Sequence, residues 1–313
     1  MIELLEVTKR FGAETAVDAI SLRVEAGELC ALVGTSGCGK STTLRMINRL
    51  LEHDDGEIHI DGQPIRSFKG RLLRRRIGYV IQNTGLFPHW TVASNIGLVP
   101  RLLKWPEQRV HDRVEELMEL LGLPMDQFAG KYPEQLSGGQ AQRVGVARAL
   151  AADPDILLMD EPFGAVDPIT RETLQRELRA LQERLQKTIV FVTHDMDEAL
   201  ALADRLVVMR DGRIVQQGEP LELVRAPADE FVASLLGGDQ RGLKEAAITR
   251  VESRMGPPSH AHPGPEVLRH ATLRDALSVM FREQAERLAV VDESGTVVGE
   301  LALRHLVERH HDG

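Results

Sequence analysis

The fold is decided by the stretch Leu29-Cys-Ala-Leu-Val-Gly34-Thr-Ser-Gly-Cys-Gly39-Lys40-Ser41. Its second half fits the pattern G-x-x-x-x-G-K-[ST], and the apolar run before it predicts a strand that leads into a helix starting at Lys40. In such a loop the glycines let backbone N–H groups surround phosphate oxygens, and the helix N-terminus adds a favourable dipole. The alternative is a chance glycine-rich turn, which would not be expected to have a strand directly before it and a helix directly after it. The stretch therefore predicts a P-loop.

Four side chains are the candidates for chemistry at this loop. Lys40 is expected to place its charge on the β and γ phosphates, and the Ser41 hydroxyl to ligate Mg²⁺, a hard cation that prefers oxygen. Asp160 ends an apolar run at residues 156–159, which aims its carboxylate at the same Mg²⁺. Glu161 follows directly and is placed to act as general base on the attacking water, the alternative being a cap of the next turn. The loop residues expected to contact the nucleotide are Gly34, Thr35, Ser36, Gly37, Cys38, Gly39, Lys40, Ser41 and Thr42.

Composition narrows the class of protein. The 313 residues are 42% hydrophobic and 27% charged, as in ordinary globular proteins. Lys plus Arg is 38 and Asp plus Glu is 47, so the formal charge is 38 − 47 = −9, which argues against sequence-independent binding of nucleic acid. Two cysteines are too few for a disulfide framework and fit a reducing cytosol. No apolar run reaches the about 20 residues of a membrane span, so we expect at most a peripheral membrane role.

Strands and helices alternate outward from the P-loop, which predicts an α/β fold with a parallel sheet covered by helices on both faces. The expected strands are residues 2–7, 19–24, 29–33, 56–62, 76–82, 156–159, 188–192 and 205–209. The expected helices are residues 40–51, 110–121, 169–185 and 196–204, within a mostly helical stretch at residues 91–150.

The pattern weakens after Gly237-Gly238. A Pro/Gly-rich loop at residues 256–265 precedes a second, shorter series of elements. In that series we expect a helix at 272–282, strands at 287–291 and 297–301, and a helix at 303–309. The tail is therefore predicted to be a small separate α/β domain.

The segment Leu136-Ser137-Gly138-Gly139-Gln140 resembles the signature motif of ABC ATPases, and the other motifs of that family follow in the expected order. The resemblance covers about residues 1–235 and implies a P-loop NTPase core of the ABC type with a helical subdomain at about 91–155. It implies that Phe11 stacks on adenine with Val17 beside it, and that Gln82, in the Q-loop, contacts Mg²⁺. It also implies that Asp167 of the D-loop and the switch histidine His194 complete the site. The D-loop has Val166 where Leu is commoner.

The same resemblance implies a site shared between two subunits. Ser137 and the backbone of Gly138 and Gly139, at a helix N-terminus, form a second anion cradle, and Gln140 belongs to the same motif. In this family that cradle meets the γ-phosphate bound to the other protomer. A head-to-tail homodimer that encloses two ATP molecules is therefore expected.

A narrower resemblance covers residues 81–96 and 99–105. These segments are similar to ATPases of osmoprotectant importers, which take up quaternary amines such as glycine betaine, choline or carnitine. The resemblance implies integral membrane permease subunits as partners, with Leu86–Trp90 receiving a coupling helix, and a substrate-binding protein as an indirect partner. It implies a peripheral place on the cytoplasmic face of the plasma membrane. The alternative for Phe87 and Trp90 is a place in the core.

Residues 248–309, including 271–277 and 288–295, resemble one CBS motif. Relatives often carry two, which sense ionic strength or bind a nucleotide, so a single motif is expected to pair with its copy in a dimer. The predicted domains are thus residues 1–236 for the ATPase, 237–247 for a linker and 248–313 for a CBS-like domain. Two alternatives stay open: an ABC ATPase without a membrane partner, and a CBS ligand sensor with weak ATPase activity.

Overall fold

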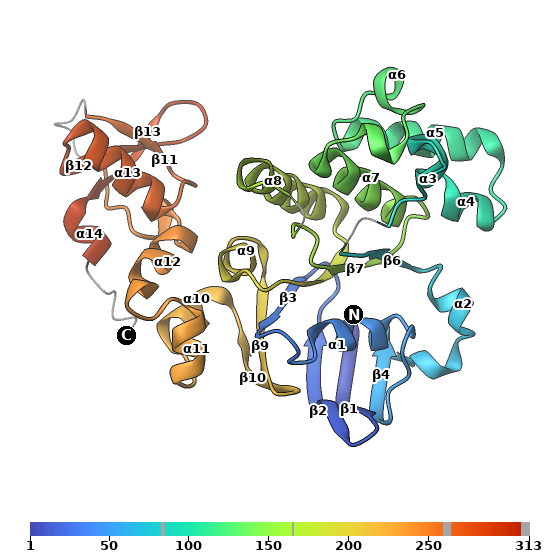
Figure 1. The fold of residues 1–313 in the computed structure, drawn as a ribbon. Helices are drawn as coiled ribbons and strands as arrows, with labels where there is room; N and C mark the ends of the chain where they lie inside the picture. Colours follow the sequence, from blue (N-terminus) through green and yellow to red (C-terminus); the bar gives the residue numbers. More distant parts are fainter. Residues whose placement is uncertain (83–84, 165, 259–263, 308–313) are drawn as a thin grey trace. The chain divides into compact units, whose positions relative to one another are not determined.

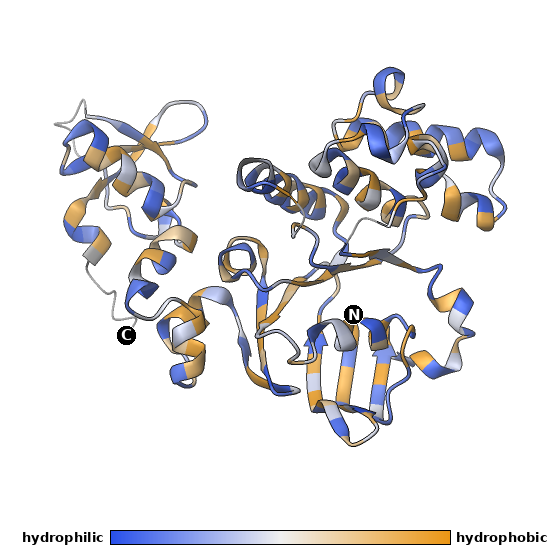
Figure 2. Ribbon diagram, viewed as in Figure 1, coloured by the Kyte–Doolittle hydropathy of each residue, from blue (hydrophilic) through white to orange (hydrophobic). Residues whose placement is uncertain are grey.

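The computed structural model describes residues 1–82, 85–164, 166–258 and 264–307. Within these ranges six strands form a sheet in the order β10-β9-β3-β8-β7-β6 (Figure 1). They are β3 (Leu29–Gly34), β6 (Ile77–Val80), β7 (Ile156–Asp160), β8 (Thr188–Val192), β9 (Arg205–Arg210) and β10 (Arg213–Gly218). Neighbours are parallel except β9 and β10, which are antiparallel. Every residue of β3, β7 and β8 is buried, and these strands are largely apolar (Figure 2), which confirms the predicted parallel α/β sheet.

A second sheet corrects the expectation for the N-terminal strands. β1 (Ile2–Phe11), β2 (Glu14–Val24), β4 (Asp55–Ile60) and β5 (Gln63–Pro64) pair antiparallel in the order β2-β1-β4-β5. Of the strands predicted before residue 34, only β3 joins the parallel sheet. The reason is local, because only two residues separate β1 from β2, and such a short connection permits antiparallel pairing alone.

The other regular elements described within residues 1–218 are mostly α-helices. They are α1 (Lys40–Ile47), α2 (Gly70–Leu73), α3 (Val92–Ile96), α4 (Leu98–Leu102), α5 (Glu107–Leu120), α6 (Met125–Phe128), α7 (Gly138–Leu150), α8 (Pro168–Leu185) and α9 (Met196–Leu202). The apolar spacing that predicted α5 is its buried face, with Val110, Val114 and Leu117 buried. Helices α3 to α7 form the predicted helical region.

The core that carries the P-loop combines both sheets. Leu44, Met46 and Ile47 of α1 are buried in one cluster with Leu4 of β1 and Leu32 of β3. Because the helix after the P-loop is packed into this cluster, the loop itself starts from a rigid strand and ends on a rigid helix. Burial of such side chains contributes about 1.5–3 kcal/mol each.

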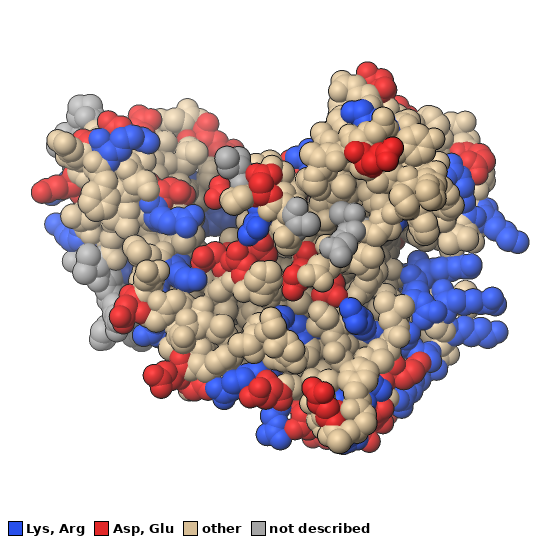
Figure 3. Space-filling model, viewed as in Figure 1, with Lys and Arg blue, Asp and Glu red and all other residues tan. Residues whose placement is uncertain are grey.

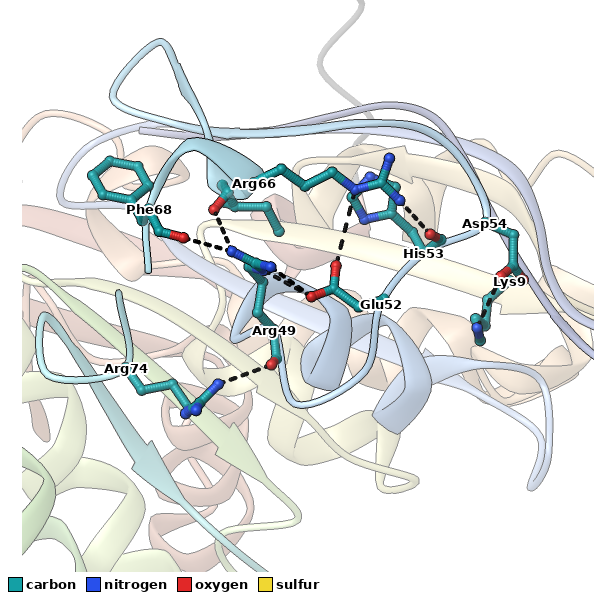
Figure 4. Close-up of polar contacts among 9 residues, drawn as sticks. Lys9, Arg49, Glu52, His53, Asp54, Arg66, Phe68 and Arg74 are labelled. Carbon is teal, nitrogen blue, oxygen red and sulfur yellow. Dashed lines mark hydrogen bonds and ion pairs between the residues drawn. The ribbon is translucent and has the colours of Figure 1, made fainter. Parts of the chain in front are cut away.

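Arginine side chains secure the far end of α1 (Figure 4). Arg49 donates to the carbonyl oxygens of Ile65 and Phe68 at 3.1 and 2.7 Å and to the Glu52 carboxylate at 2.7 Å. Arg74 in turn donates to the carbonyl of Arg49 at 3.0 Å. These contacts attach the connection between α1 and β4 to the segment that leads into α2.

The β9–β10 hairpin was not predicted. Its turn residues Asp211 and Gly212 have φ of 50° and 79°, the left-handed pair that a two-residue hairpin turn requires. The Asp-Gly dipeptide after an apolar strand was the signal in the sequence. Asp61-Gly62 forms a similar turn, with φ of 51° and 73°, and joins β4 to β5.

The chain divides into two compact units, Met1–Gly218 and Glu219–Gly313. In the second unit, three strands of the described chain form a sheet in the order β11-β12-β13. Its elements are α10 (Pro220–Arg225), α11 (Glu230–Leu235), η3 (Gly238–Gln240), α12 (Arg241–Ile248), η4 (Val251–Ser253), β11 (Glu266–Leu268), α13 (Leu273–Glu283), β12 (Arg287–Val291), β13 (Val297–Ala302) and α14 (Leu303–Val307). The predicted α13, β12, β13 and α14 are all present, while residues 308–309 of the last predicted helix lie outside the described residues.

The boundary between the units differs from the predicted one. It follows Gly218 rather than residue 236, and the segment predicted as a linker contains η3 and α12. The reason is packing, because α12 lies against both α10 and α13 and so joins the residues on either side of Gly237 into one unit. A glycine run is weak evidence for a domain boundary when the helix after it packs against elements that lie before and after the run in the chain.

Candidate nucleotide-binding site

The P-loop conformation requires glycine at two positions. Gly34 has φ of 145°, and a Cβ there would lie 2.1 Å from the Met209 carbonyl oxygen. Gly39 has φ of 102°, and a Cβ there would lie 2.5 Å from the Ala16 carbonyl oxygen. The Lys40 side chain crosses the loop, with Nζ donating to the carbonyl oxygens of Gly34 at 2.8 Å and Thr35 at 2.9 Å. The loop is therefore a closed turn of backbone around a buried ammonium group.

Ser41 and Asp160 meet beside this loop. Ser41 Oγ donates a 2.7 Å hydrogen bond to Asp160 Oδ1. Asp160 ends β7, is 6% exposed, and has Arg45 Nη2 at 3.9 Å from its other carboxylate oxygen. A hydroxyl and a carboxylate that converge in this way form the oxygen donor set that a hard divalent cation prefers.

Three predicted residues converge from the ends of three neighbouring strands. Gln82 follows β6, Glu161 follows β7 and His194 follows β8, and the three strands are adjacent and parallel. Gln82 Nε2 donates to Glu161 Oε2 at 2.7 Å, and His194 Nδ1 lies 3.5 Å from the same oxygen. Glu161 has φ of 47°, and its N–H donates to the Val192 carbonyl at 3.0 Å, which turns its side chain out of the strand direction. The structure thus assembles Gln82, Glu161 and His194 into one cluster.

The signature residues occupy a different part of the first unit, since α7 and α1 lie apart (Figure 1). Ser137 caps α7: its Oγ accepts from the Gln140 N–H at 3.3 Å, and Gln140 Oε1 accepts from the Ser137 N–H at 2.9 Å. Gly139 allows close packing of α8, because a Cβ there would lie 2.6 Å from Thr170 Cγ2. Asp167 caps α8 by accepting from the Thr170 N–H at 3.1 Å. Signature motif and D-loop aspartate therefore sit at the starts of two helices that touch.

Phe11 and Val17 take different positions. Phe11 is 50% exposed at the end of β1, with Lys9 Nζ 5.5 Å from its ring centre. Val17 is fully buried, and a Cβ on Gly39 would lie 3.1 Å from its Cγ2. The exposed ring is available for stacking, whereas Val17 supports the P-loop from beneath.

Burial keeps the Cys38 thiol of the P-loop protonated. Cys38 is 3% exposed, and this burial raises the pKa of its thiol, against the opposing influence of Lys40. The thiol is therefore held in its protonated form, as a packing group rather than a nucleophile.

A polar cluster behind His194 was not predicted. Thr193 Oγ1 donates to Glu198 Oε2 at 2.6 Å, and Arg171 reaches both Asp195 and Glu198. Thr193 and Asp195 flank His194 in the chain. Arg171 and Glu198 belong to no short motif, and their only signal is position, in the first turns of α8 and α9.

The sequence is similar to a known family and to known proteins. Residues 17–164 match the ABC transporter family. The chain is 51% identical over 307 residues to the glycine betaine uptake system ATP-binding protein YehX of Escherichia coli, covering 98% of this chain and 99% of that protein. The chain belongs to the ABC transporter family of ATP-binding proteins. This ABC ATPase is also 48% identical over 300 residues to the glycine betaine/carnitine/choline transport ATP-binding protein OpuCA of Bacillus subtilis, covering 96% and 77% respectively.

Solved structures agree with this family assignment. The post-hydrolysis dimer of the ATP-binding cassette MJ0796 bound to ADP and Pi covers 70% of the ABC ATPase, with 35% identity and a TM-score of 0.63. The cbiO1 structure from Clostridium perfringens, part of the ABC transporter complex cbiONQ, covers 78% with 28% identity and a TM-score of 0.68. The chain is thus an ATP-binding, ATP-hydrolysing cassette. Among its described helices, none combines the length and apolar character of a membrane span.

Proposed function

We propose that this ABC ATPase powers an importer of osmoprotectant quaternary amines such as glycine betaine, as one half of a homodimer attached to integral membrane permease subunits. The convergence of Gln82, Glu161 and His194 supports the hydrolytic part of this proposal. Similarity over nearly the full chain to a glycine betaine uptake ATP-binding protein supports the substrate class.

In the proposed site, Glu161 is the general base. A carboxylate that accepts a hydrogen bond from an amide has a defined direction. A general base contributes about 10²–10⁴-fold to a rate. Gln82 orients it, and His194 acts on the γ-phosphate region from the end of the neighbouring strand. Mg²⁺ would be held by Ser41 and Asp160, whose oxygens already converge, with Gln82 contributing nearby. The ion would neutralise charge on the phosphate oxygens.

The remaining motif residues are assigned by position. The P-loop N–H groups and Lys40 surround the phosphates, and the half-exposed Phe11 ring stacks on adenine. Ser137 and Asp167, at the starts of α7 and α8, complete the site of the second protomer in the proposed dimer. The capping box leaves the N-terminus of α7 organised before any phosphate arrives, which suits an anion cradle.

Permease docking is supported by the surface around Phe87 and Trp90. Their rings lie 4.8 Å apart and remain 45% and 40% exposed, so the alternative of core residues does not hold. Fully buried Asn95 holds this loop: its Nδ2 donates to the carbonyl oxygens of Phe87 and Trp90 at 3.2 and 3.1 Å. A rigid loop that exposes two aromatic rings is the kind of surface that binds a partner helix.

A groove beside the loop has a volume of about 300 Å³ and is lined in part by Phe87, Val99, Arg74 and Arg148. Arg74 belongs to a run of basic residues gathered at the edge that carries α2 (Figure 3). An apolar floor with a basic rim fits a short amphipathic helix that carries an acidic side chain. Such a partner places the ATPase on the cytoplasmic face of the membrane, at its periphery.

The cargo is not expected to touch this chain. Quaternary ammonium groups are bound by aromatic cages, and only 4% of these residues are aromatic. Selectivity would belong to the permease and to a substrate-binding protein. The segment from residue 248 is proposed to be a single CBS-like domain that modulates activity.

Reconstitution tests this function. The ATPase is combined with its permease in vesicles containing ATP, and uptake of labelled glycine betaine, choline and carnitine is measured, with an amino acid as control. ATP-dependent uptake of at least one quaternary amine is expected. An ATPase activity that no permease stimulates would instead support the alternative without a membrane partner.

A further inference from the structure

The backbone on both sides of His194 is held by the side chains of its two chain neighbours and of Glu198. Thr193, which is 2% exposed, donates from Oγ1 to Glu198 Oε2 at 2.6 Å and accepts from the Asp195 N–H at 3.0 Å. The Asp195 carboxylate accepts from two N–H groups in the first turn of α9. The His194 side chain itself is 64% exposed, with Glu161 at 3.5 Å. Its direction therefore depends on how its two chain neighbours are held.

Arg171 connects these neighbours to another segment. It lies in the first turn of α8, and its Nη2 donates to the Val166 carbonyl oxygen at 3.1 Å, directly before Asp167. The same guanidinium faces Asp195, with Nη1 at 3.5 Å from Oδ2, and Glu198, with Nε at 3.8 Å from Oε1. One side chain thus contacts the segment that contains Asp167 and the segment that contains His194.

The charges around Glu198 favour an arginine at position 171. Glu198 is 6% exposed, and burial raises the pKa of its carboxyl group, while Thr193 and Arg171 favour the charged form. Arg171 Nε is buried and, among the described residues, makes no hydrogen bond, although Glu198 lies at ion-pair distance. A planar guanidinium addresses several acceptors in fixed directions, which an ammonium group does not.

We propose that Arg171 is a positioning residue for ATP hydrolysis, which couples the Val166–Asp167 segment to His194. The inference rests on the proposed function, since it takes His194 as a residue that acts on bound ATP. Movement of the Asp167 segment, when a second protomer meets it, is passed through the guanidinium to Asp195 and Glu198. These residues hold the backbone that carries His194, so the imidazole is aligned only when the other subunit is in place.

The same helix provides a matched control. Arg179 is 35% exposed against 29% for Arg171, and it also joins α8 to the segment around α9. It contacts Glu183 of α8 itself at 2.9 Å. Its other contacts, with Asp204 at 2.7 Å and the Leu202 carbonyl at 3.0 Å, lie at the far end of α9 from His194. Loss of Arg179 therefore removes a comparable number of bonds without touching the neighbours of His194.

The experiment compares Arg171→Met, Arg171→Lys and Arg179→Met in the full chain. We measure kcat, KM for ATP, equilibrium binding of a fluorescent ATP analogue, and the thermal midpoint. Arg171→Met is expected to lower kcat about tenfold or more while KM and binding stay within about twofold, because alignment and not binding is lost. Arg171→Lys should recover part of kcat, and Arg179→Met should keep kcat within about twofold at a similar change in thermal midpoint.

A second variant covers the case in which Arg171→Met does not fold. Glu198→Gln keeps an acceptor for Thr193 and removes the charge facing Arg171, and it is expected to lower kcat about fivefold or more. Where all variants fold, the Arg171→Met, Glu198→Gln double variant should lose little more than the larger single effect. A kcat near that of the unaltered chain in Arg171→Met, or an equal loss in Arg179→Met, overturns the inference, as does an unchanged kcat in Glu198→Gln.

His194→Ala separates this inference from the proposed function. If His194→Ala hydrolyses ATP normally, the proposed role of the site fails. If His194→Ala is slow while Arg171→Met is not, the site stands and only the coupling through Arg171 is rejected.

Discussion

Gln82 Nε2 lies 2.7 Å from Glu161 Oε2, although 79 residues separate the two in the chain. The contact crosses from the end of β6 to the end of β7, which are paired in the parallel sheet. An amide that donates to a carboxylate fixes its direction without neutralising it. Glu161 is therefore held in a fixed direction at the edge of the sheet where Asp160 and the P-loop also lie.

Replacing Glu161 by Gln is expected to preserve ATP binding and to slow hydrolysis about 10²-fold or more, because the base is removed while the shape is kept. ATP should then accumulate at the interface and drive a stable dimer. Steady-state ATPase rates and light scattering with and without ATP measure the two effects. The control is Glu177→Gln, which alters a carboxylate of the same unit bonded to Arg143 at 2.7 Å. Normal turnover in the Glu161 variant would show that Glu161 is not the general base.

Ser137 is expected to act on ATP bound to the other protomer. Ser137→Arg and Lys40→Ala protomers are each inactive alone, but in a mixed dimer one composite site carries both changes and the other carries neither. Mixing should therefore restore part of the ATPase activity, with a maximum near equal amounts. Tagged protomers confirm that mixed dimers form. Mixed dimers without any recovered activity would show that one intact site is not sufficient.

Phe87→Ala combined with Trp90→Ala is expected to weaken binding to the permease about tenfold or more, because aromatic anchors dominate such interfaces. The ATPase rate of the isolated subunit should stay within about twofold, since neither ring touches the nucleotide site. Co-purification with the permease and ATPase assays measure both. Leu102→Ala is the control, as Leu102 is 56% exposed on α4 and is not part of the groove. Equal loss in the control would argue against a docking role for this loop.

His53 is expected to make stability depend on pH. It is 3% exposed beside the Arg49 network (Figure 4), and burial, followed by Arg66, lowers its pKa. The folded protein therefore favours neutral His53. The contribution of His53 to the free energy of unfolding is fully present above the pKa of the unfolded chain, about 6.5. At lower pH this contribution falls, because the unfolded chain binds the proton first. The slope is at most about 1.4 kcal/mol per pH unit.

His53→Gln should flatten this decline between about pH 6.5 and 5, as measured by thermal or denaturant unfolding. His111→Gln is the control, because His111 is 59% exposed on α5. A decline of unchanged slope in the His53 variant would assign the pH dependence to other groups.

Local patterns predicted most of the elements correctly. Strands β3, β7 and β8 are continuous apolar runs, and α5 has helical apolar spacing, so each element is encoded within its own residues. The β1–β2 pairing and the unit boundary after Gly218 were missed. The pairing has a local cause, the two-residue connection between the strands, whereas the boundary depends on which distant segments pack together, as α12 does with α10 and α13.

By itself the sequence determined that a P-loop stands between a buried strand and a helix, because glycine spacing and apolar periodicity are local properties. The residue pattern identified Glu161, and the resemblance identified Gln82 and His194, each separately. Only the tertiary structure placed them together, because the parallel order β8-β7-β6 brings three strand ends to one edge. It alone revealed Arg171 between the segments of Asp167 and His194, since ion pairs between helices follow from packing and leave no periodic trace in the chain.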